Sequence, residues 1–123
     1  MPRILAVATM DSKGEELAYV AQQVSAAGCH CELVDVSCSV GAVPAVGATI
    51  SRQAIAAAHP QGAAAVLDVE DRGEAVSAMS SALTQYVTRE AANSFDAIIG
   101  IGGSGGTALI SPAMQALPVG FPK

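Results

Sequence analysis

A cluster of glycines around one serine is the part of this chain best suited to chemistry. Residues 102–107 read GGSGGT and follow an apolar run over 97–101. That order is typical of a strand, a tight turn and a helix. Glycines permit positive φ and let another molecule approach the main chain, and a helix N-terminus offers unpaired N–H groups and the positive end of its dipole. The turn is therefore predicted to hold an anion, most often a phosphate.

Three motifs fit this stretch, so its spelling alone does not choose among them. Gly100, Gly102 and Gly105 satisfy the dinucleotide pattern G-x-G-x-x-G. Residues 102–106 satisfy G-x-S-x-G, in which Ser104 would be a hydrolase nucleophile, and GGSGGT resembles the GGDGT phosphate loop of lipid and NAD kinases. A Walker loop is absent because no lysine directly follows the glycines, and the acidic residue that the dinucleotide pattern wants about 20 positions on is absent too.

The three motifs leave three functions open. A nucleotide- or phosphate-binding module with no assigned reaction is the first hypothesis. A hydrolase is the second, and it needs a base and an oriented acid within hydrogen-bond reach of Ser104. His59 lies on a different segment, and nothing marks it for that role. The third is a purely structural assembly domain in which the glycine turn only packs against a partner.

The elements that must position this turn begin with a βαβ unit. Residues 3–9 are an apolar run typical of a parallel strand covered on both faces. A polar turn is expected over 10–14, followed by a helix over 15–27 that Gly28 ends. Residues 31–36 are the second strand, so a right-handed crossover is expected.

The rest of the chain adds a long loop, helices and a third strand. The loop over 37–49 is longer than most such connections, which is typical of functional loops. The expected later elements are a helix capped by Ser51 and running to Ala58, helix or loop over 63–69, a long helix ending near Asn93, a strand over 97–101, a helix from about 106 to 117, and an apolar strand beginning in 118–123.

Together these elements predict an α/β fold. The expected sheet is open and parallel, with three to four strands in the Rossmann-like or flavodoxin-like order 2-1-3-4 and helices on both faces. The 123 residues have room for a single domain. A strand that has just begun predicts that the chain is the N-terminal part of a longer protein, and an uncovered sheet edge predicts a homodimer.

Ligands in such a sheet bind outside the carboxyl ends of the strands, a rule that gathers three loops. The predicted nucleotide-binding residues are Gly102, Gly103, Ser104, Gly105, Gly106, Thr107, Asp11, Lys13 and Asp35. Lys13 would place a positive charge on the phosphate, Asp11 would orient it or hold a magnesium ion, and Asp35 would bond a ribose hydroxyl. The alternatives are a solvated turn in which Asp11 only caps the first helix and a plain strand-end turn at Asp35.

Composition argues against several other functions. The formal net charge is −5 and there are few aromatic residues, so nucleic acid is not expected as a direct ligand. No apolar run approaches the roughly 18 residues of a membrane span, and the start is too soon interrupted by charge to be a signal peptide, so the cytoplasm is expected. Three cysteines predict free thiols. Because a strand would point His30 away from Cys29 and Cys31, no metal site is predicted.

Six spaced motifs give nearly the whole chain a resemblance to one family. They are DSKGEELAYV, LVDV, ISR, DRGEAV, IGGSGGTAL and ALPVGFPK. Their order resembles the N-terminal region of the Tm-one-like family, which contains a plant tobamovirus-resistance protein and bacterial relatives of unassigned function. The resemblance implies a mixed α/β region, ATP binding in the plant member, dimerisation and a longer full-length protein. It also makes Arg72 and Glu74 candidates for the site or for a subunit contact.

Overall fold

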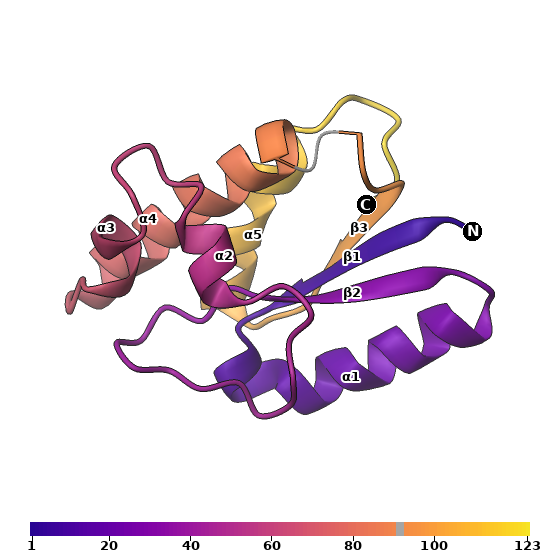
Figure 1. Cartoon of the computed structure of the whole chain (residues 1–123), viewed down its shortest axis with the longest axis horizontal. Helices are drawn as coiled ribbons and strands as arrows, with labels where there is room; N and C mark the ends of the chain where they lie inside the picture. The colour runs from indigo at the N-terminus through magenta and orange to yellow at the C-terminus, as the bar shows by residue number, and fades with distance from the viewer. Residues whose placement is uncertain (91–92) are drawn as a thin grey trace.

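A three-stranded parallel sheet forms the central layer of the computed structural model, which describes residues 1–90 and 93–123 (Figure 1). The strands are β1 (Arg3–Ala8), β2 (His30–Asp35) and β3 (Ala97–Gly100). Their order is β2-β1-β3 and both pairings are parallel. This confirms the predicted α/β fold and the strand order 2-1-3, and no fourth strand lies in the described ranges.

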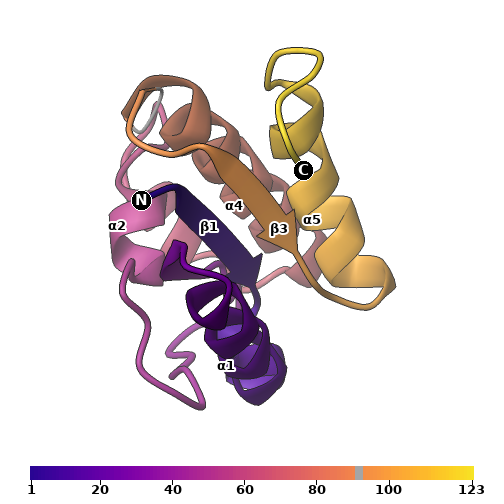
Figure 2. The ribbon, with the colours of Figure 1, turned by 90° about the vertical axis from the view of Figure 1, so that its right-hand side faces the viewer.

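Helices cover both faces of the sheet, as predicted (Figure 2). They are α1 (Met10–Ala26), α2 (Arg52–Ala56), α3 (Ala64–Leu67), α4 (Arg72–Gln85), the π-helix η1 (Tyr86–Glu90) and α5 (Ser104–Gln115). Alternate residues of β1 point to opposite faces. Ala6 and Ala8 pack under α1, while Leu5 and Val7 belong to the larger core beneath α2, α4 and α5.

Helix α1 begins at Met10, so the polar turn predicted over 10–14 is wrong. Thr9 makes no side-chain cap hydrogen bond, so no local cap marks this helix start in the sequence. The acceptors for the first N–H groups come instead from the segment at the end of β2, described below. Lys13 has non-helical angles (φ −119°, ψ 15°) and marks a kink one turn into the helix.

The later helices follow the predicted order with shifted ends. Ser51 caps α2 as predicted, because its hydroxyl accepts a hydrogen bond from the Ala54 N–H at 3.1 Å. The long helix was predicted to end near Asn93; the structure has Asn93 in a turn and helical residues as far as η1, and residues 91–92 lie outside the described part. Helix α5 begins at Ser104, two residues earlier than predicted, and continues through Pro112.

The segment 118–123 does not begin a strand, so that prediction is wrong. It contacts the free edge of β3 through one backbone hydrogen bond, from the Ile98 N–H to the Pro122 carbonyl at 3.1 Å. Phe121 packs edge-on against Phe95, with ring centroids 5.3 Å apart. Pro118 and Pro122 have no N–H to give to a strand ladder, which prevents regular pairing. Over residues 1–90 and 93–123, no helix has the length and apolar character that a membrane span requires.

Glu32 binds two side chains at the amino end of the sheet. Its Oε1 atom lies 2.8 Å from His30 Nε2 and 3.3 Å from Arg3 Nε. Burial raises the pKa of Glu32, but hydrogen bonds from His30, Thr49 and Arg3 and the charge of Arg3 outweigh it, so the pKa lies below its ordinary value. A carboxyl with a lowered folded-state pKa stabilises the fold above its ordinary pKa, and this contribution is lost as the pH falls through the lowered value.

We therefore expect Glu32→Gln to reduce the free energy of unfolding at pH 7 and to have little effect at pH 3. Urea denaturation at pH 7, 5 and 3 measures the difference from wild type. Glu15→Gln is the matched control, because Glu15 is exposed. A Glu32→Gln deficit that is the same at pH 7 and pH 3 would contradict the assignment.

Candidate functional site

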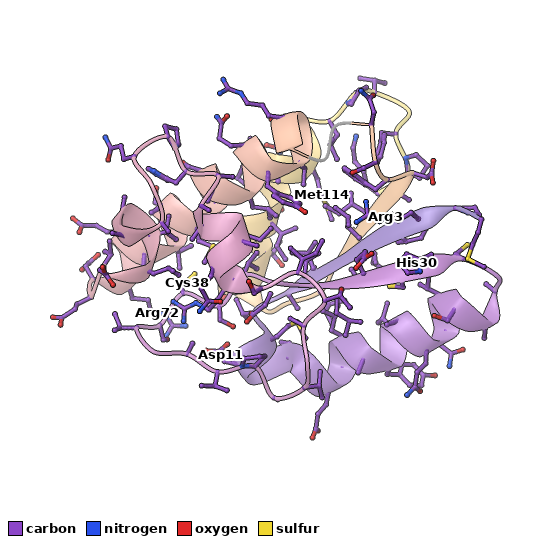
Figure 3. The ribbon with its side chains drawn as sticks, in the orientation of Figure 1. Arg3, Asp11, His30, Cys38, Arg72 and Met114 are labelled. Atoms are coloured by element: carbon purple, nitrogen blue, oxygen red, sulfur yellow. The ribbon has the colours of Figure 1, made fainter. Side chains whose placement is uncertain are left out.

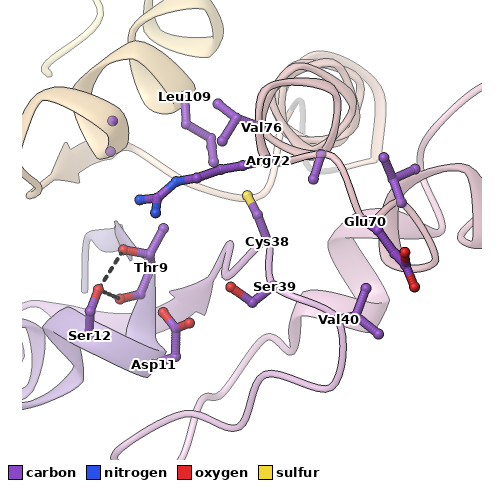
Figure 4. Close-up of a pocket in the computed structure, with 14 residues that line it drawn as sticks. Thr9, Asp11, Ser12, Cys38, Ser39, Val40, Glu70, Arg72, Val76 and Leu109 are labelled. Atoms are coloured by element: carbon purple, nitrogen blue, oxygen red, sulfur yellow. Dashed lines mark hydrogen bonds between the residues drawn. The ribbon is translucent and has the colours of Figure 1, made fainter.

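A pocket of about 530 Å³ opens at the carboxyl edge of the sheet (Figure 4). Four segments line it: the start of α1, the loop after β2, the segment around the start of α4, and the first turns of α5. The lining residues are Thr9, Asp11, Ser12, Cys38, Ser39, Val40, Val69, Glu70, Arg72, Ala75, Val76, Gly105, Gly106 and Leu109. The pocket therefore lies where ligands bind to open parallel sheets, and its size is ordinary for a small-molecule site.

Arg72 is the only basic residue in the lining of this pocket. Its guanidinium reaches from the start of α4 toward Thr9 and the first turn of α5, while the Glu70 side chain points away (Figure 4). Arg72 is exposed, and among the described residues no hydrogen bond or salt bridge holds its guanidinium. The preceding residue, Asp71, fixes the helix start because its carboxylate accepts a hydrogen bond from the Glu74 N–H at 2.9 Å. The guanidinium is free to pair with an anionic ligand.

The first turn of α5 borders the same pocket and has N–H groups without a helical partner. The N-cap residue is Gly103, which has no side chain that could accept a hydrogen bond. The N–H groups of Ser104, Gly105 and Gly106 therefore have no acceptor within the helix. The Thr107 N–H is already used, because it donates to the Gly103 carbonyl at 2.9 Å. Gly105 and Gly106 line the pocket, whereas Ser104 does not.

The glycines of this turn do not use positive φ, so that part of the prediction is wrong. Positive φ occurs at Gly28, Gly41, Gly62 and Gly120. At Gly102 the requirement is close approach, since a Cβ there would lie 2.9 Å from the Gly106 Cα. A Cβ at Gly105 would meet nothing within 4 Å. The strand turns directly into the helix with ordinary backbone angles, and the small residues allow the two to touch.

Asp35 does not line the pocket, but it binds the backbone of two segments next to it. Its carboxylate is 1% exposed, and Oδ1 accepts hydrogen bonds from the Met10 N–H at 3.1 Å and from the Ser37 N–H at 2.9 Å. The Ser37 hydroxyl also donates to Asp35 at 2.5 Å and accepts from the Asp11 N–H at 3.0 Å. These two side chains cap α1 and thereby hold Asp11 at the pocket. The sequence predicted a ribose contact for Asp35, and the structure gives its Oδ1 atom three internal donors.

Hydroxyl groups at the start of α1 supply further polar contacts. Thr9 Oγ1 and Ser12 Oγ lie 3.2 Å apart, and Ser12 Oγ donates to the Thr9 carbonyl at 3.3 Å (Figure 4). Both residues line the pocket beside Asp11. Because a hydroxyl can rotate to donate to a new acceptor, the pair could bind an anion placed near Arg72.

Lys13 lies in a second, shallower pocket and not beside Arg72. That pocket, of about 470 Å³, is lined by Lys13, Glu16, Tyr19, Val20, Ile101, Gly102 and Gly103. Lys13 Nζ is 3.7 Å from Glu16 Oε2, an exposed pair. The structure thus divides the predicted site residues: Asp11, Gly105 and Gly106 share the first pocket, and Lys13, Gly102 and Gly103 share the second.

The thiols and histidines do not form a nucleophilic site. Burial raises the pKa of Cys38 to about 11, so its thiol is protonated at neutral pH. His59 Nδ1 accepts a hydrogen bond from the Gln61 N–H, His30 is at the amino end of β2, and neither lines the pocket. All three cysteines are free, as predicted, and among the described residues no three His, Cys, Asp or Glu side chains are grouped to hold a metal.

The predicted nucleotide-binding residues did not include Thr9, Ser12, Cys38 or Arg72, although Ser12 and Cys38 lie in the loops 11–14 and 35–41 that the topology rule gathers at this edge. Arg72 was flagged only through the resemblance of DRGE. Arg72, Cys38 and Asp11 come from three separate segments, and Figure 3 shows them together at one end of the sheet, beyond the carboxyl ends of the strands. A usable signal was available for Thr9 and Ser12, because a hydroxyl beside the carboxyl end of the central strand lies where a ligand is expected.

Comparison with known proteins identifies relatives. The N-terminal domain of the uncharacterised protein family UPF0261 matches residues 2–123. A UPF0261 protein of Rhizobium meliloti is 46% identical over 123 residues, and one of Mesorhizobium japonicum is 44% identical; each match covers all of this chain and 30% of the relative. The ToMV susceptible protein tm-1 of Solanum lycopersicum is 29% identical over 136 residues, covering 99% of this chain and 18% of that protein. The chain therefore spans less than a third of the length of these curated relatives.

Proposed function

The chain belongs to the uncharacterised protein family UPF0261, and from this membership and the geometry of the larger pocket we propose that it is a nucleotide-binding module whose ligand is ATP. One observation carries the proposal: the Arg72 guanidinium, which has no partner among the described residues, and the first turn of a twelve-residue helix, at Gly105 and Gly106, line the same pocket. Helix N-termini and arginine both favour phosphate groups. ATP is the nucleotide implied by the resemblance to the Tm-one-like family.

The lining of the pocket contains both polar and aliphatic side chains, which suits a ligand with phosphates and an uncharged ring. Phosphates would lie between Arg72 and the first turn of α5, with the hydroxyls of Thr9 and Ser12 as further donors. The lining also contains the aliphatic side chains of Val40, Val69, Val76 and Leu109, which could accept an uncharged ring. Asp11 would hold a magnesium ion beside the phosphates, since carboxylate oxygen is a preferred ligand of that ion.

The other sequence-based alternatives receive no further support. The hydrolase alternative needs a base near Ser104, and the pocket that Gly105 and Gly106 line contains no histidine. The homodimer and the cytoplasmic location stay predictions, as does the role of Lys13 near a phosphate.

Arg72→Met is expected to weaken ATP binding by about tenfold to a hundredfold. A hydrogen bond to a charged group contributes roughly 1.5 to 3 kcal/mol, which corresponds to that range in affinity. Isothermal titration calorimetry with ATP and with inorganic pyrophosphate measures the change on wild type and variant. Pyrophosphate isolates the phosphate half of the site from the base half.

Two further variants make this test specific. Arg89→Met is the matched control, because Arg89 is exposed and lies on η1, about 25 Å farther along the same helical segment at 1.5 Å per residue. It changes the net charge equally and should leave the affinity unchanged. Lys13→Ala tests the second pocket: a loss of affinity there, with Arg72→Met unaffected, would place the phosphate beside Lys13. No heat with either ligand would reject the proposed function.

A further inference from the structure

The side chain of Arg52, at the start of α2, is buried and forms no salt bridge with a carboxylate in the described part of the chain. Only 3% of the residue is exposed. Its Nη1 group donates to the carbonyl oxygens of Ser39 at 2.7 Å and Ala42 at 3.4 Å. Its Nε group is also buried and has no hydrogen-bond partner in the described part of the chain. A buried charge is costly unless other groups compensate for it, and two neutral carbonyls compensate only partly.

One of the two carbonyls that Arg52 binds, that of Ser39, belongs to the wall of the larger pocket. We call residues 38–40 the loop wall, because Cys38, Ser39 and Val40 all line that pocket. Arg52 contacts the middle of the loop wall directly through the Ser39 carbonyl. The next anchor along the loop is the Ala45 N–H, which donates to the Met10 carbonyl at 2.9 Å. Between these anchors, Arg52 supplies the side-chain hydrogen bonds that hold residues 39–42 in place.

The charge of Arg52 also acts on the pocket. Burial is the main influence on the Cys38 thiol, but among the charged groups Arg52 has the largest effect on its pKa, which it lowers. Asp11 and Asp35 act in the opposite direction, and Arg72 acts in the same direction as Arg52 with a smaller effect. Two arginines thus contribute positive potential at the loop wall, one exposed in the lining and one fixed behind it.

We propose that Arg52 is a positioning residue that prepares the pocket for an anionic ligand: it holds the loop wall in place, and its buried charge is compensated when a phosphate group binds. This inference rests on the proposed function for the identity of the ligand. The holding of the loop wall can be tested without any ligand.

Two substitutions separate the charge from the hydrogen bonds. Arg52→Met keeps a long side chain but removes both, whereas Arg52→Lys keeps the charge and a donor. Hydrogen exchange at the Ala42 N–H, which donates to the Ser39 carbonyl at 3.0 Å, reports on the loop wall. Calorimetry with inorganic pyrophosphate reports on the anion site, circular dichroism checks folding, and Arg89→Met is the control for net charge.

In Arg52→Met we expect exchange at Ala42 to be at least about tenfold faster and pyrophosphate affinity to be about tenfold weaker. In Arg52→Lys we expect an affinity within about threefold of wild type, because the charge remains. If Arg52→Met is unfolded, the lysine variant still tests the inference. Equal losses of affinity in the methionine and lysine variants, or a folded methionine variant with wild-type affinity, would overturn it.

Failure of the ligand assignment gives a different pattern. Wild-type protein that binds neither pyrophosphate nor ATP rejects the proposed function and, with it, the anionic role of Arg52. Faster exchange at Ala42 in Arg52→Met would still support the holding of the loop wall. Unchanged exchange would overturn that part as well.

Discussion

Gly102→Ala is expected to lower the free energy of unfolding by about 1 to 3 kcal/mol, the usual range for an atom forced into a packed region. The new Cβ would lie 2.9 Å from the Gly106 Cα and 3.3 Å from its carbonyl carbon. Both are backbone atoms of the first turn of α5, so no side chain can rotate away to make room. The helix start must move, and the N–H groups that face the pocket move with it.

Gly105→Ala is the matched control for this substitution. Gly105 lies beside Gly106 in the first turn of α5, but a Cβ added at Gly105 would meet nothing within 4 Å. Alanine also favours a helix over glycine by up to about 1 kcal/mol, so this variant should be as stable as wild type or more stable. Urea denaturation measures both. Equal losses in the two variants would show that the turn needs glycine flexibility and not the contact at Gly102.

Asp35→Ala is expected to lower the free energy of unfolding by about 2 to 6 kcal/mol, because each of the two buried N–H groups that it leaves unpaired costs about 1 to 3 kcal/mol. The substitution leaves the Met10 and Ser37 N–H groups without their acceptor. It also frees the Ser37 hydroxyl that accepts from the Asp11 N–H. We therefore expect two losses together: lower stability, and weaker binding of pyrophosphate because the start of α1 is no longer held at the pocket.

Asp96→Ala is the control for this prediction. The Asp96 carboxylate also accepts a backbone hydrogen bond, from the Arg3 N–H at 2.8 Å, but that contact is exposed. Its removal should cost less than about 1 kcal/mol, because water replaces the lost partner. Chemical denaturation measures the stability of both aspartate variants, and titration with pyrophosphate measures their affinity. An Asp35→Ala protein as stable as Asp96→Ala would refute the supporting role.

The sheet was predictable because its signals are local. Residues 3–9 form an apolar run with no polar alternation, and β1 lies at the centre of the sheet with helices on both faces. Ser51 was correctly predicted as a cap because the Ala54 N–H, which donates to its hydroxyl, lies only three residues away. The start of α1 was missed because its cap is Asp35, which lies 25 residues from Met10. Spacing patterns carry no information on a partner so far away.

The site was only partly predictable for the same reason. The topology rule indicated the correct edge for a pocket and gathered Asp11 with the glycine turn. It could not separate Lys13 from Asp11, because nothing in the sequence marks the kink at Lys13, and the structure places the two residues in different pockets. The glycine pattern suggested flexibility, whereas the requirement at Gly102 is a contact between two backbone segments. Such contacts are visible only after the fold is known.

The central position of β1 has a consequence for folding during translation. β1 pairs with β2 inside the first 35 residues, but its other edge must wait for β3, as the contact between Arg3 and Asp96 across 93 residues shows. At the usual rate of translation that wait lasts roughly 5 to 20 s. During this interval the apolar edge of β1 is open on the ribosome, and open edges recruit wrong strands. We therefore expect wrong strand pairing to threaten the nascent chain more than the folded chain.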